Sequence, residues 1–484
     1  MSTAASDIKV LDPPLAWRRL RGRTGGLQLR VPRTGLHAGP RANAFALVII
    51  LALGLFLAAK AEFRSETSND VLYLYGIAVT SIVLVQMAVA FGRYRDYAIA
   101  SPSAIASVGM SSSWPRVSCI VAVHNDEEII EQCVTSIVAQ TYGNKEVIII
   151  DDGSTDGTRA LLLRLAAQHP ITVIPLEENV GKKKALSVGV LAATGSIYAF
   201  SDSDSVWAPD AVARCVLILD KRSDVGAVSG HCRALNASRN LLTKIQDSWY
   251  EGQFSIRKAF ESAFGVVTCV SGPLAVFRKA AIYNYIPAWE ADNFLGQEFR
   301  FATDRMLTGF VLVGAHVGEK LKQEYAHTPF LDEEFPARDW KILYCRSARS
   351  WTVVPDTFGK LVRQQIRWKK SFVRSIFFTG RYYWRKPFVP ALAYYLHVLF
   401  VLAGPFVAFR HLVYVPVHGN AESAFLYLAG IVVVGSMFGL AHWRVEPGSS
   451  HWIYRPLMSL ISTTLLSWLL IYSLFTIKRM RWAR

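Results

Sequence analysis

The stretch Val117-Ser118-Cys119-Ile120-Val121-Ala122-Val123 is a short apolar run rich in β-branched residues, which is typical of a buried strand. Residues 127–139 have the spacing of an amphipathic helix, and residues 146–150 repeat the strand pattern. A strand, a helix and a strand in this order predict a β-α-β unit that opens a parallel sheet. Ligands of such sheets bind beyond the carboxyl ends of the strands, where His124-Asn125-Asp126 and Asp151-Asp152-Gly153 fall.

Two polar segments follow this unit, and each has two interpretations. Residues 151–158 combine carboxylates with turn-forming glycines, which suits a ribose hydroxyl or base edge but equally a plain helix N-cap. The segment Gly181-Lys182-Lys183-Lys184 puts cations at a predicted helix start, where a diphosphate would bind. Three neighbouring lysines are more commonly a solvated turn, so neither segment identifies a site by itself.

A third polar segment ends another predicted strand. Residues 197–200 are apolar, and Ser201-Asp202-Ser203-Asp204-Ser205 comes directly after them. Two carboxylates at positions i and i+2 can share a hard divalent cation, which then bridges phosphate oxygens. Such triplets are frequent, and this one carries weight because it ends a strand in a chain with two other segments that suit a nucleotide sugar.

Apolar runs dominate the two ends of the chain. A helix needs roughly 20 residues to cross a ~30 Å hydrocarbon layer. Runs of about this length lie at 43–61, 71–91, 388–413, 423–442 and 456–477. Seven arginines precede the first run, which favours a cytoplasmic amino terminus without a signal peptide and a cytosolic middle domain. Five crossings would leave the basic tail outside, so we expect residues 452–477 to form a broken pair of short helices or a re-entrant segment.

The formal net charge of +16 indicates attraction either to anionic lipid headgroups or to anionic substrates. Most of the excess lies next to the apolar runs, which favours lipid. No nucleic-acid-binding module accompanies the charge, so we expect no nucleic-acid partner. The six cysteines have neither CxxC nor zinc spacing, which predicts reduced thiols.

Three further motifs complete an ordered series: Ser271-Gly272-Pro273-Leu274, Thr303-Asp304-Arg305 and Gln364-Gln365-Ile366-Arg367-Trp368. With these motifs, residues 115–375 resemble the processive family 2 glycosyltransferases, which include hyaluronan, chitin and cellulose synthases. Residues 269–274 and the tail from Tyr472 to Arg484 are most similar to hyaluronan synthases. The resemblance implies an α/β fold: a GT-A domain inserted between transmembrane helices, with amphipathic interfacial helices.

The resemblance also implies a division of the chain. It comprises a basic cytosolic segment (1–42), two transmembrane helices (43–91), a cytosolic GT-A catalytic domain (92–360), interfacial helices (361–387), carboxyl-terminal transmembrane helices (388–477) and a cytosolic tail (478–484).

Residue roles follow from the matching positions. Asp304 is implied as the general base that deprotonates the acceptor hydroxyl. The donor would be held by His124, Asp126, Asp152, Lys182, Lys183, Asp202, Gln364, Arg367 and Trp368. Asp202 and Asp204 would hold Mg²⁺ or Mn²⁺, and the acceptor would contact Cys269, Ser271, Gly272 and Trp368. The segment around Trp368 also suits an amphipathic helix at a lipid interface, and both interpretations are compatible. The aromatic residues of 242–264 suit an acceptor path, but packing is the commoner meaning of such a stripe.

The implied activity is processive, inverting synthesis of a β-linked polysaccharide, with the growing chain secreted through the enzyme's own channel in the plasma membrane. Hyaluronan from UDP-GlcNAc and UDP-GlcA is the leading product, and a chitin-like GlcNAc homopolymer is the alternative. A non-processive lipid-phosphate sugar transferase would not need the segment 364–368. A catalytically inactive scaffold would require Asp304 to be misplaced.

Four features depart from the family pattern. His124 occupies a position where Tyr is usual, and Thr303 stands where many members have an acid. Residues 316–340 are longer and more polar than expected, and the tail ends in Trp482-Ala483-Arg484 without the usual Gly-Thr.

Overall fold

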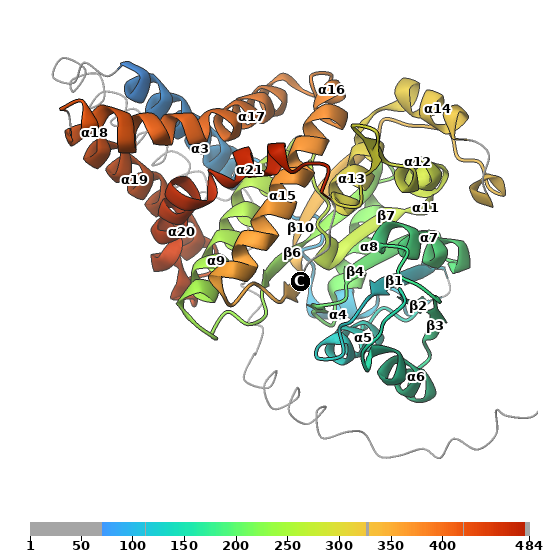
Figure 1. Cartoon of the computed structure of the whole chain (residues 1–484). Helices are drawn as coiled ribbons and strands as arrows, with labels where there is room; N and C mark the ends of the chain where they lie inside the picture. The colour runs from blue at the N-terminus through green and yellow to red at the C-terminus, as the bar shows by residue number, and fades with distance from the viewer. Residues whose placement is uncertain (1–69, 112, 326–328, 420, 480–484) are drawn as a thin grey trace, which may run out of the picture.

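The computed structural model describes residues 70–111, 113–325, 329–419 and 421–479. Its centre is an eight-stranded mixed sheet with the order β3-β2-β1-β4-β7-β6-β10-β5 (Figure 1). The strands are β1 (Val117–Val123), β2 (Lys145–Asp151), β3 (Thr172–Pro175), β4 (Ile197–Asp202), β5 (Ser205–Trp207), β6 (Val225–Ala234), β7 (Ala275–Arg278) and β10 (Lys341–Thr352). A separate hairpin pairs β8 (Asn293–Phe294) with β9 (Gln297–Glu298).

Helices surround this sheet. Those of the central domain are α4 (Pro102–Ala106), α5 (Ile130–Val138), α6 (Thr158–Gln168), α7 (Lys182–Ala192), α8 (Ala211–Lys221), α9 (Leu241–Gly252), the π-helix η2 (Gln253–Lys258), α10 (Ala259–Ser262), η3 (Gly272–Leu274), α11 (Lys279–Ile282), η4 (Tyr283–Tyr285), α12 (Ile286–Glu290), α13 (Thr303–Leu312), α14 (Ala315–Glu324) and η5 (Pro329–Leu331). The remaining helices are α3 (Asp70–Gly92), α15 (Phe358–Phe378), α16 (Gly380–Tyr383), α17 (Phe388–Phe409), η6 (Arg410–Tyr414), α18 (Val415–Val417), α19 (Glu422–Val445), η7 (His451–Tyr454), α20 (Arg455–Ile461), η8 (Ser462–Leu466) and α21 (Leu469–Phe475).

The predicted β-α-β unit is confirmed, because β1, α5 and β2 follow one another and β1 pairs in parallel with both β2 and β4. Every residue of β1 is buried, as expected for a strand with helices on both faces of its sheet. β7 was not predicted; it lies antiparallel between β4 and β6. All six cysteines have free thiols in this structure.

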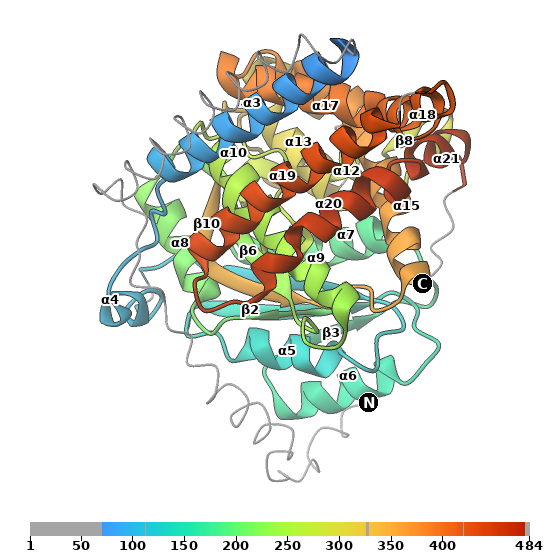
Figure 2. The same ribbon diagram turned by 90° about the vertical axis from the view of Figure 1, so that its left-hand side faces the viewer.

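Three described helical segments are long and apolar enough to cross a membrane, namely Tyr73–Gly92, Phe388–Val417 and Glu422–Val445. The segments His451–Leu466 and Leu469–Phe475 form a further candidate that is bent by 42°. This bend agrees with the prediction of a broken pair of helices or a re-entrant segment within 452–477. Figure 2 shows α3, α19 and α20 side by side along one face of the molecule. The predicted span 43–61, the basic segment before it and residues 480–484 lie outside the described residues.

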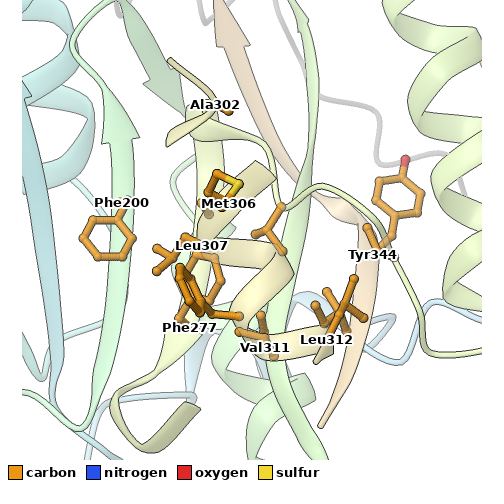
Figure 3. Close-up of a cluster of buried hydrophobic side chains, with 14 of the residues drawn as sticks. Phe200, Phe277, Ala302, Met306, Leu307, Val311, Leu312 and Tyr344 are labelled. Carbon is orange, nitrogen blue, oxygen red and sulfur yellow. The ribbon is translucent and has the colours of Figure 1, made fainter. Parts of the chain in front are cut away.

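The helix α13 is anchored to the sheet by its apolar face. Met306, Leu307 and Val311 are buried in the same cluster as Phe200 of β4 and Phe277 of β7 (Figure 3). Because a close-packed core holds its members rigidly, the first turn of α13 has a fixed position relative to the end of β4. That first turn contains Asp304.

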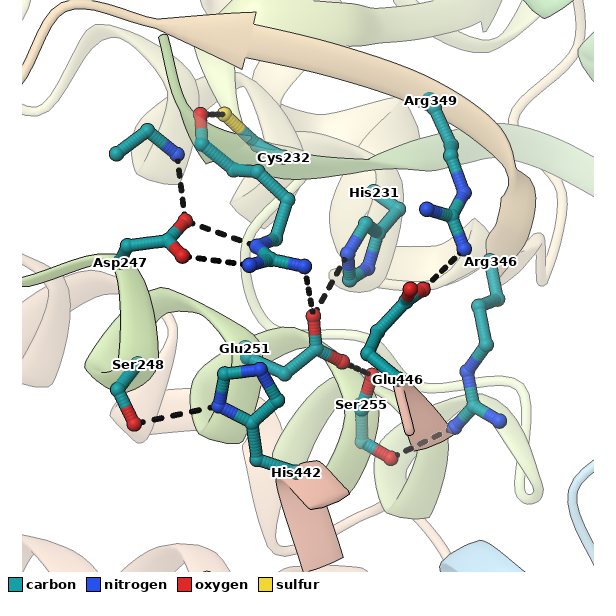
Figure 4. A network of polar contacts seen from close by, with 12 residues as sticks. His231, Cys232, Asp247, Ser248, Glu251, Ser255, Arg346, Arg349, His442 and Glu446 are labelled. Carbon is teal, nitrogen blue, oxygen red and sulfur yellow. Dashed lines mark hydrogen bonds and ion pairs between the residues drawn. The ribbon is translucent and has the colours of Figure 1, made fainter. Parts of the chain in front are cut away.

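A buried polar network joins the sheet to the candidate membrane helix α19 and the segment that follows it (Figure 4). Asp247 of α9 lies 2.5 Å from Arg233 Nη2 of β6 and 2.7 Å from His451 Nδ1 of η7. Arg349 of β10 pairs with Glu446, which directly follows α19. Removing one partner of such a buried pair is strongly destabilising, because the other charge is left without compensation. The network therefore fixes α9 between the sheet and the α19–η7 segment.

The packing of α7 on the sheet gives a test of this architecture. A Cβ atom at Gly189 would lie 2.5 Å from Ile120 Cγ2 and 2.6 Å from Ile150 Cδ1. We expect Gly189→Val to lower the free energy of unfolding by about 1–3 kcal/mol through overpacking, measured by urea unfolding in detergent. Leu191→Val, at an exposed position of the same helix, is the control and should change it by less than about 0.5 kcal/mol. Equal stability of the two variants would contradict this close approach.

Candidate functional site

A cavity of about 1490 Å³ begins at the carboxyl ends of β1 and β4 and extends to the apolar helices. The predicted site residues in its wall are Asp126, Lys182, Asp202, Asp204, Cys269, Ser271, Gly272, Asp304, Gln364, Arg367 and Trp368. Its other end is lined by Tyr75 of α3, Phe400 and Gly404 of α17, and Thr463 of η8. The three acids Asp202, Asp204 and Asp304 thus share one cavity, and a passage leads from them between the candidate membrane spans.

Asp202 is the last residue of β4, and Asp204 follows at the bend into β5. Lys182 Nζ donates a hydrogen bond to Asp202 Oδ1, and Thr352 Oγ1 donates to Asp204 Oδ1 at 3.0 Å. Burial, together with the charge of Asp202, raises the pKa of Asp204 to about 6. The neighbouring carboxylates therefore repel each other, and a bound cation would relieve this repulsion.

The donor set at Asp202 and Asp204 suits a divalent cation whose remaining ligands come from a substrate. Within the described ranges, no cluster of three or more His, Cys, Asp or Glu side chains could hold a metal by itself. Two carboxylates plus diphosphate oxygens form the type of oxygen-rich shell that Mg²⁺ adopts with phosphorylated ligands. The residues present therefore fit Mg²⁺ or Mn²⁺ together with a nucleotide sugar.

The Ser-Gly-Pro segment lies against these acids. A Cβ atom at Gly272 would come within 2.6 Å of both carboxylate oxygens of Asp202, so only glycine fits at this distance. Lys258 Nζ donates to Ser271 Oγ at 2.5 Å and to Ser229 Oγ at 2.8 Å. The buried Lys258 was not identified from the sequence, because a lysine within a helical stretch gives no sign of which way it points.

Asp304 lies at the start of α13, directly after Ala302 and Thr303. Ala302 has φ of 59°, a left-handed conformation that is costly for alanine and that turns the chain into the helix. Cys269 Sγ lies 3.2 Å from Asp304 Oδ2. Burial, with the charge of Asp304, raises the pKa of the Cys269 thiol to about 12. The thiol therefore stays protonated at neutral pH and donates to the carboxylate.

The segment 364–368 lies on the amphipathic helix α15, as the sequence predicted. Gln364 Oε1 and Gln365 Nε2 are buried and have no hydrogen-bond partner among the described residues, which suits a polar ligand. The Trp368 ring lies 5.5 Å from Trp249 and 6.3 Å from Tyr250, and all three rings line the cavity. Packing was the commoner expectation for Trp249 and Tyr250, and the structure adds that they form part of the cavity wall.

Three predicted donor-binding residues do not line the cavity. His124 Nδ1 lies 2.9 Å from the backbone oxygen of Asp152. The buried carboxylate of Asp152 accepts hydrogen bonds from the amides of Val180 and Gly181 at 2.8 and 3.1 Å. Lys183 Nζ donates to Asp292 Oδ2 at 2.7 Å, facing away from Lys182. In this structure these three side chains support the loop before α7 and the helix itself.

Comparison with known proteins agrees with this geometry. Residues 118–286 match the family "Glycosyl transferase family 2". N-acetylglucosaminyltransferases of Mesorhizobium japonicum and Rhizobium meliloti are each 30% identical to the chain, over 54% and 64% of its length. The matched regions span 57% and 67% of those two proteins. A hyaluronan synthase of Streptococcus pyogenes is 24% identical over 90% of this chain and 94% of its own. The chain belongs to glycosyltransferase family 2, and its α/β domain has the GT-A-like fold.

Proposed function

We propose that this protein is a membrane-embedded, processive polysaccharide synthase. It transfers sugars from UDP-sugar donors to a growing β-linked polymer and passes that polymer through its own membrane helices. The observation that carries this proposal is the shared cavity, which connects Asp202, Asp204 and Asp304 with α3, α17 and η8. A transferase that released its product after one step would not need such a passage.

The donor side of the proposed reaction lies at the end of β4. Asp202 and Asp204 would hold the divalent cation, and Lys182, which pairs with Asp202, would contact the diphosphate. When bound, the cation neutralises the charge that develops on the leaving UDP. Asp126, whose carboxylate accepts a hydrogen bond from Ser203 Oγ at 2.5 Å, faces the nucleoside.

The acceptor side is formed by Asp304 and the aromatic wall. Asp304 accepts the proton of the acceptor hydroxyl as that oxygen attacks the anomeric carbon. The Cys269 thiol orients its carboxylate, and Trp368, Trp249 and Tyr250 give flat apolar faces on which sugar rings stack. A single displacement inverts the anomeric configuration, so α-linked donors give β-linkages without a second carboxylate as nucleophile.

Hyaluronan, made from UDP-GlcNAc and UDP-GlcA, is the product that we favour. The similarity to a hyaluronan synthase extends over nearly the whole chain, including the membrane helices. The cavity wall near His397 of α17 contains Arg257, Arg305 and Lys369. Cations in the passage suit a polymer that carries a carboxylate on every second sugar.

A GlcNAc homopolymer is the second candidate. It is favoured by the higher identity, 30%, to N-acetylglucosaminyltransferases, over 54% and 64% of this chain. The two candidates differ in whether UDP-GlcA is consumed.

We further propose a multi-pass plasma-membrane protein with a cytosolic catalytic domain and the division of the chain described above. The basic residues Arg93 and Arg95 directly after α3 support this orientation, since positive charge accumulates on the cytosolic side.

Donor use tests the proposed function directly. Purified protein in membranes, supplied with Mn²⁺ or Mg²⁺, should form high-molecular-weight polymer only when both UDP-GlcNAc and UDP-GlcA are present. Size-exclusion chromatography of radiolabelled product is the measurement, and chelation of the metal is the control. Polymer from UDP-GlcNAc alone would assign the homopolymer instead, and no polymer under any condition would exclude synthase activity.

Asp304→Asn tests the proposed base. Because asparagine cannot accept the proton, polymer formation should fall by about a hundredfold or more, while the affinity for UDP changes by less than about twofold. Initial rates of UDP release and UDP binding by calorimetry are the measurements. Asp220→Asn, at an exposed position of α8, is the control. A normal rate in Asp304→Asn would remove Asp304 from this role.

Trp368→Ala tests acceptor stacking. Loss of a contact worth about 0.5–1.5 kcal/mol should shorten the polymer by roughly two- to tenfold, because the chain dissociates more often between additions. Product length is measured by gel electrophoresis. Trp384→Ala removes a tryptophan that is 62% exposed and outside the cavity wall, and it should leave product length unchanged. Equal lengths from both variants would argue against stacking on Trp368.

A further inference from the structure

One buried carboxylate, that of Asp292, joins two helices that carry opposite sides of the cavity. Lys183 Nζ of α7 donates to Asp292 Oδ2 at 2.7 Å. Arg374 of α15 donates from Nη2 and Nε to Asp292 Oδ1 at 2.6 and 3.0 Å. The side chains of Lys183, Asp292 and Arg374 are 6%, 1% and 12% exposed, so all three charges are withdrawn from solvent.

The hairpin of β8 and β9 begins at this carboxylate and returns to it. The amide of Phe299 donates to the backbone oxygen of Asp292 at 2.7 Å, and Lys183 Nζ donates to the backbone oxygen of Phe299 at 2.8 Å. The turn between the strands uses Leu295 and Gly296 with φ of 53° and 80°, as a tight two-residue hairpin requires. The hairpin is thus a compact unit, and Lys183 contacts both of its ends.

Each element tied to Asp292 carries part of the proposed site. Lys183 is adjacent to Lys182, which pairs with Asp202. Arg374 follows Arg367 by seven residues, or about two helical turns, on the same helix. The chain that leaves the hairpin reaches Asp304 through Ala302, whose amide donates to Ser371 Oγ of α15 at 3.1 Å. Asp292 therefore connects the donor side, the acceptor side and the segment that carries the proposed base.

Stability alone does not account for a buried group of this kind. An apolar cluster of similar volume would often stabilise the fold equally well or better, since burying charges requires their desolvation. Two cations on one carboxylate do fix the direction and distance of the elements that bear them, because Arg374 holds Oδ1 with two donors while Lys183 holds Oδ2. The role of such an arrangement is to fix the relative positions of α7, α15 and the hairpin.

We propose that Asp292 is a positioning residue of the transfer reaction. It sets the separation between α7, on the diphosphate side, and α15, on the acceptor side, and so holds the acceptor in line with the donor. This inference rests on the proposed function. It predicts a loss in the rate of transfer that is much larger than any loss of nucleotide binding, since Asp292 is bonded to Lys183 and Arg374 rather than to Lys182 or to the acids at the end of β4.

The test is Asp292→Asn in the full-length protein, which keeps the shape of the side chain and removes its charge. We expect kcat for UDP release to fall by about tenfold or more, because small misalignments of reacting groups are costly, while UDP affinity stays within about twofold. Both are normalised to folded protein by thermal melting. Glu298→Gln is the matched control: Glu298 lies on the same hairpin, pairs with Lys184 at 3.2 Å and is partly exposed, so its kcat should stay within about twofold.

A second variant keeps the test informative if Asp292→Asn does not fold. Arg374→Lys retains the charge but loses the fork, and it should lower kcat by about threefold or more at an unchanged melting temperature. A normal kcat per folded molecule in either variant would overturn the positioning role, as would parallel losses of UDP affinity and kcat.

The failure of this inference and that of the proposed function are distinguishable. UDP release from whichever donor the wild-type protein uses reports on Asp292. Polymer size in the wild-type protein reports on the synthase function.

Discussion

Repulsion among carboxylates in one cavity is the constraint on which this structure depends. Asp202 and Asp204 lie at the end of β4, and the raised pKa of Asp204 records the cost of burying it beside Asp202. Lys182 pairs with Asp202, and a bound cation would relieve the remaining repulsion between the two acids. The sheet fixes these two acids, and the apolar face of α13 fixes the helix that carries Asp304 (Figure 3). Close packing of Gly189 against the sheet and of Gly272 against Asp202 then keeps α7 and the Ser-Gly-Pro segment at fixed distances from the sheet and from Asp202.

Local pattern was sufficient for the elements that are periodic or strongly apolar. β1 was predicted over its exact bounds, because a run of buried β-branched residues has few alternatives. The break in the last apolar run was predicted from a charge rule, and the structure has a bend of 42° there. β7 was missed, because its antiparallel insertion between β4 and β6 depends on contacts with strands some 40 to 80 residues away in the chain.

The residue types of the candidate site could be predicted from the sequence, but the directions in which the side chains point could be predicted only in part. Lys182 and Lys183 are chemically equivalent in the sequence, but a helix turns by about 100° per residue. Lys182 therefore lines the cavity while Lys183 points to Asp292, which lies 109 residues away in sequence. Asp152 shows a second limit of prediction from the sequence. Its carboxylate accepts hydrogen bonds from backbone amides of the next loop, and no sequence pattern indicates this. Trp249 and Tyr250 were ambiguous for the same reason, since an aromatic stripe has the same spacing in a core and in a cavity wall.

The buried network around Asp247 bears on how a polymer would travel. Trp249 and Tyr250 belong to the same helix as Asp247, whose partners lie in β6 and η7. Ion pairs tie this helix to the sheet on one side and to η7 on the other, so we expect it to keep its position as sugars are added. A saccharide would therefore move over an aromatic surface that stays in place. Any conformational change that drives translocation would have to come from elements that are not attached to α9.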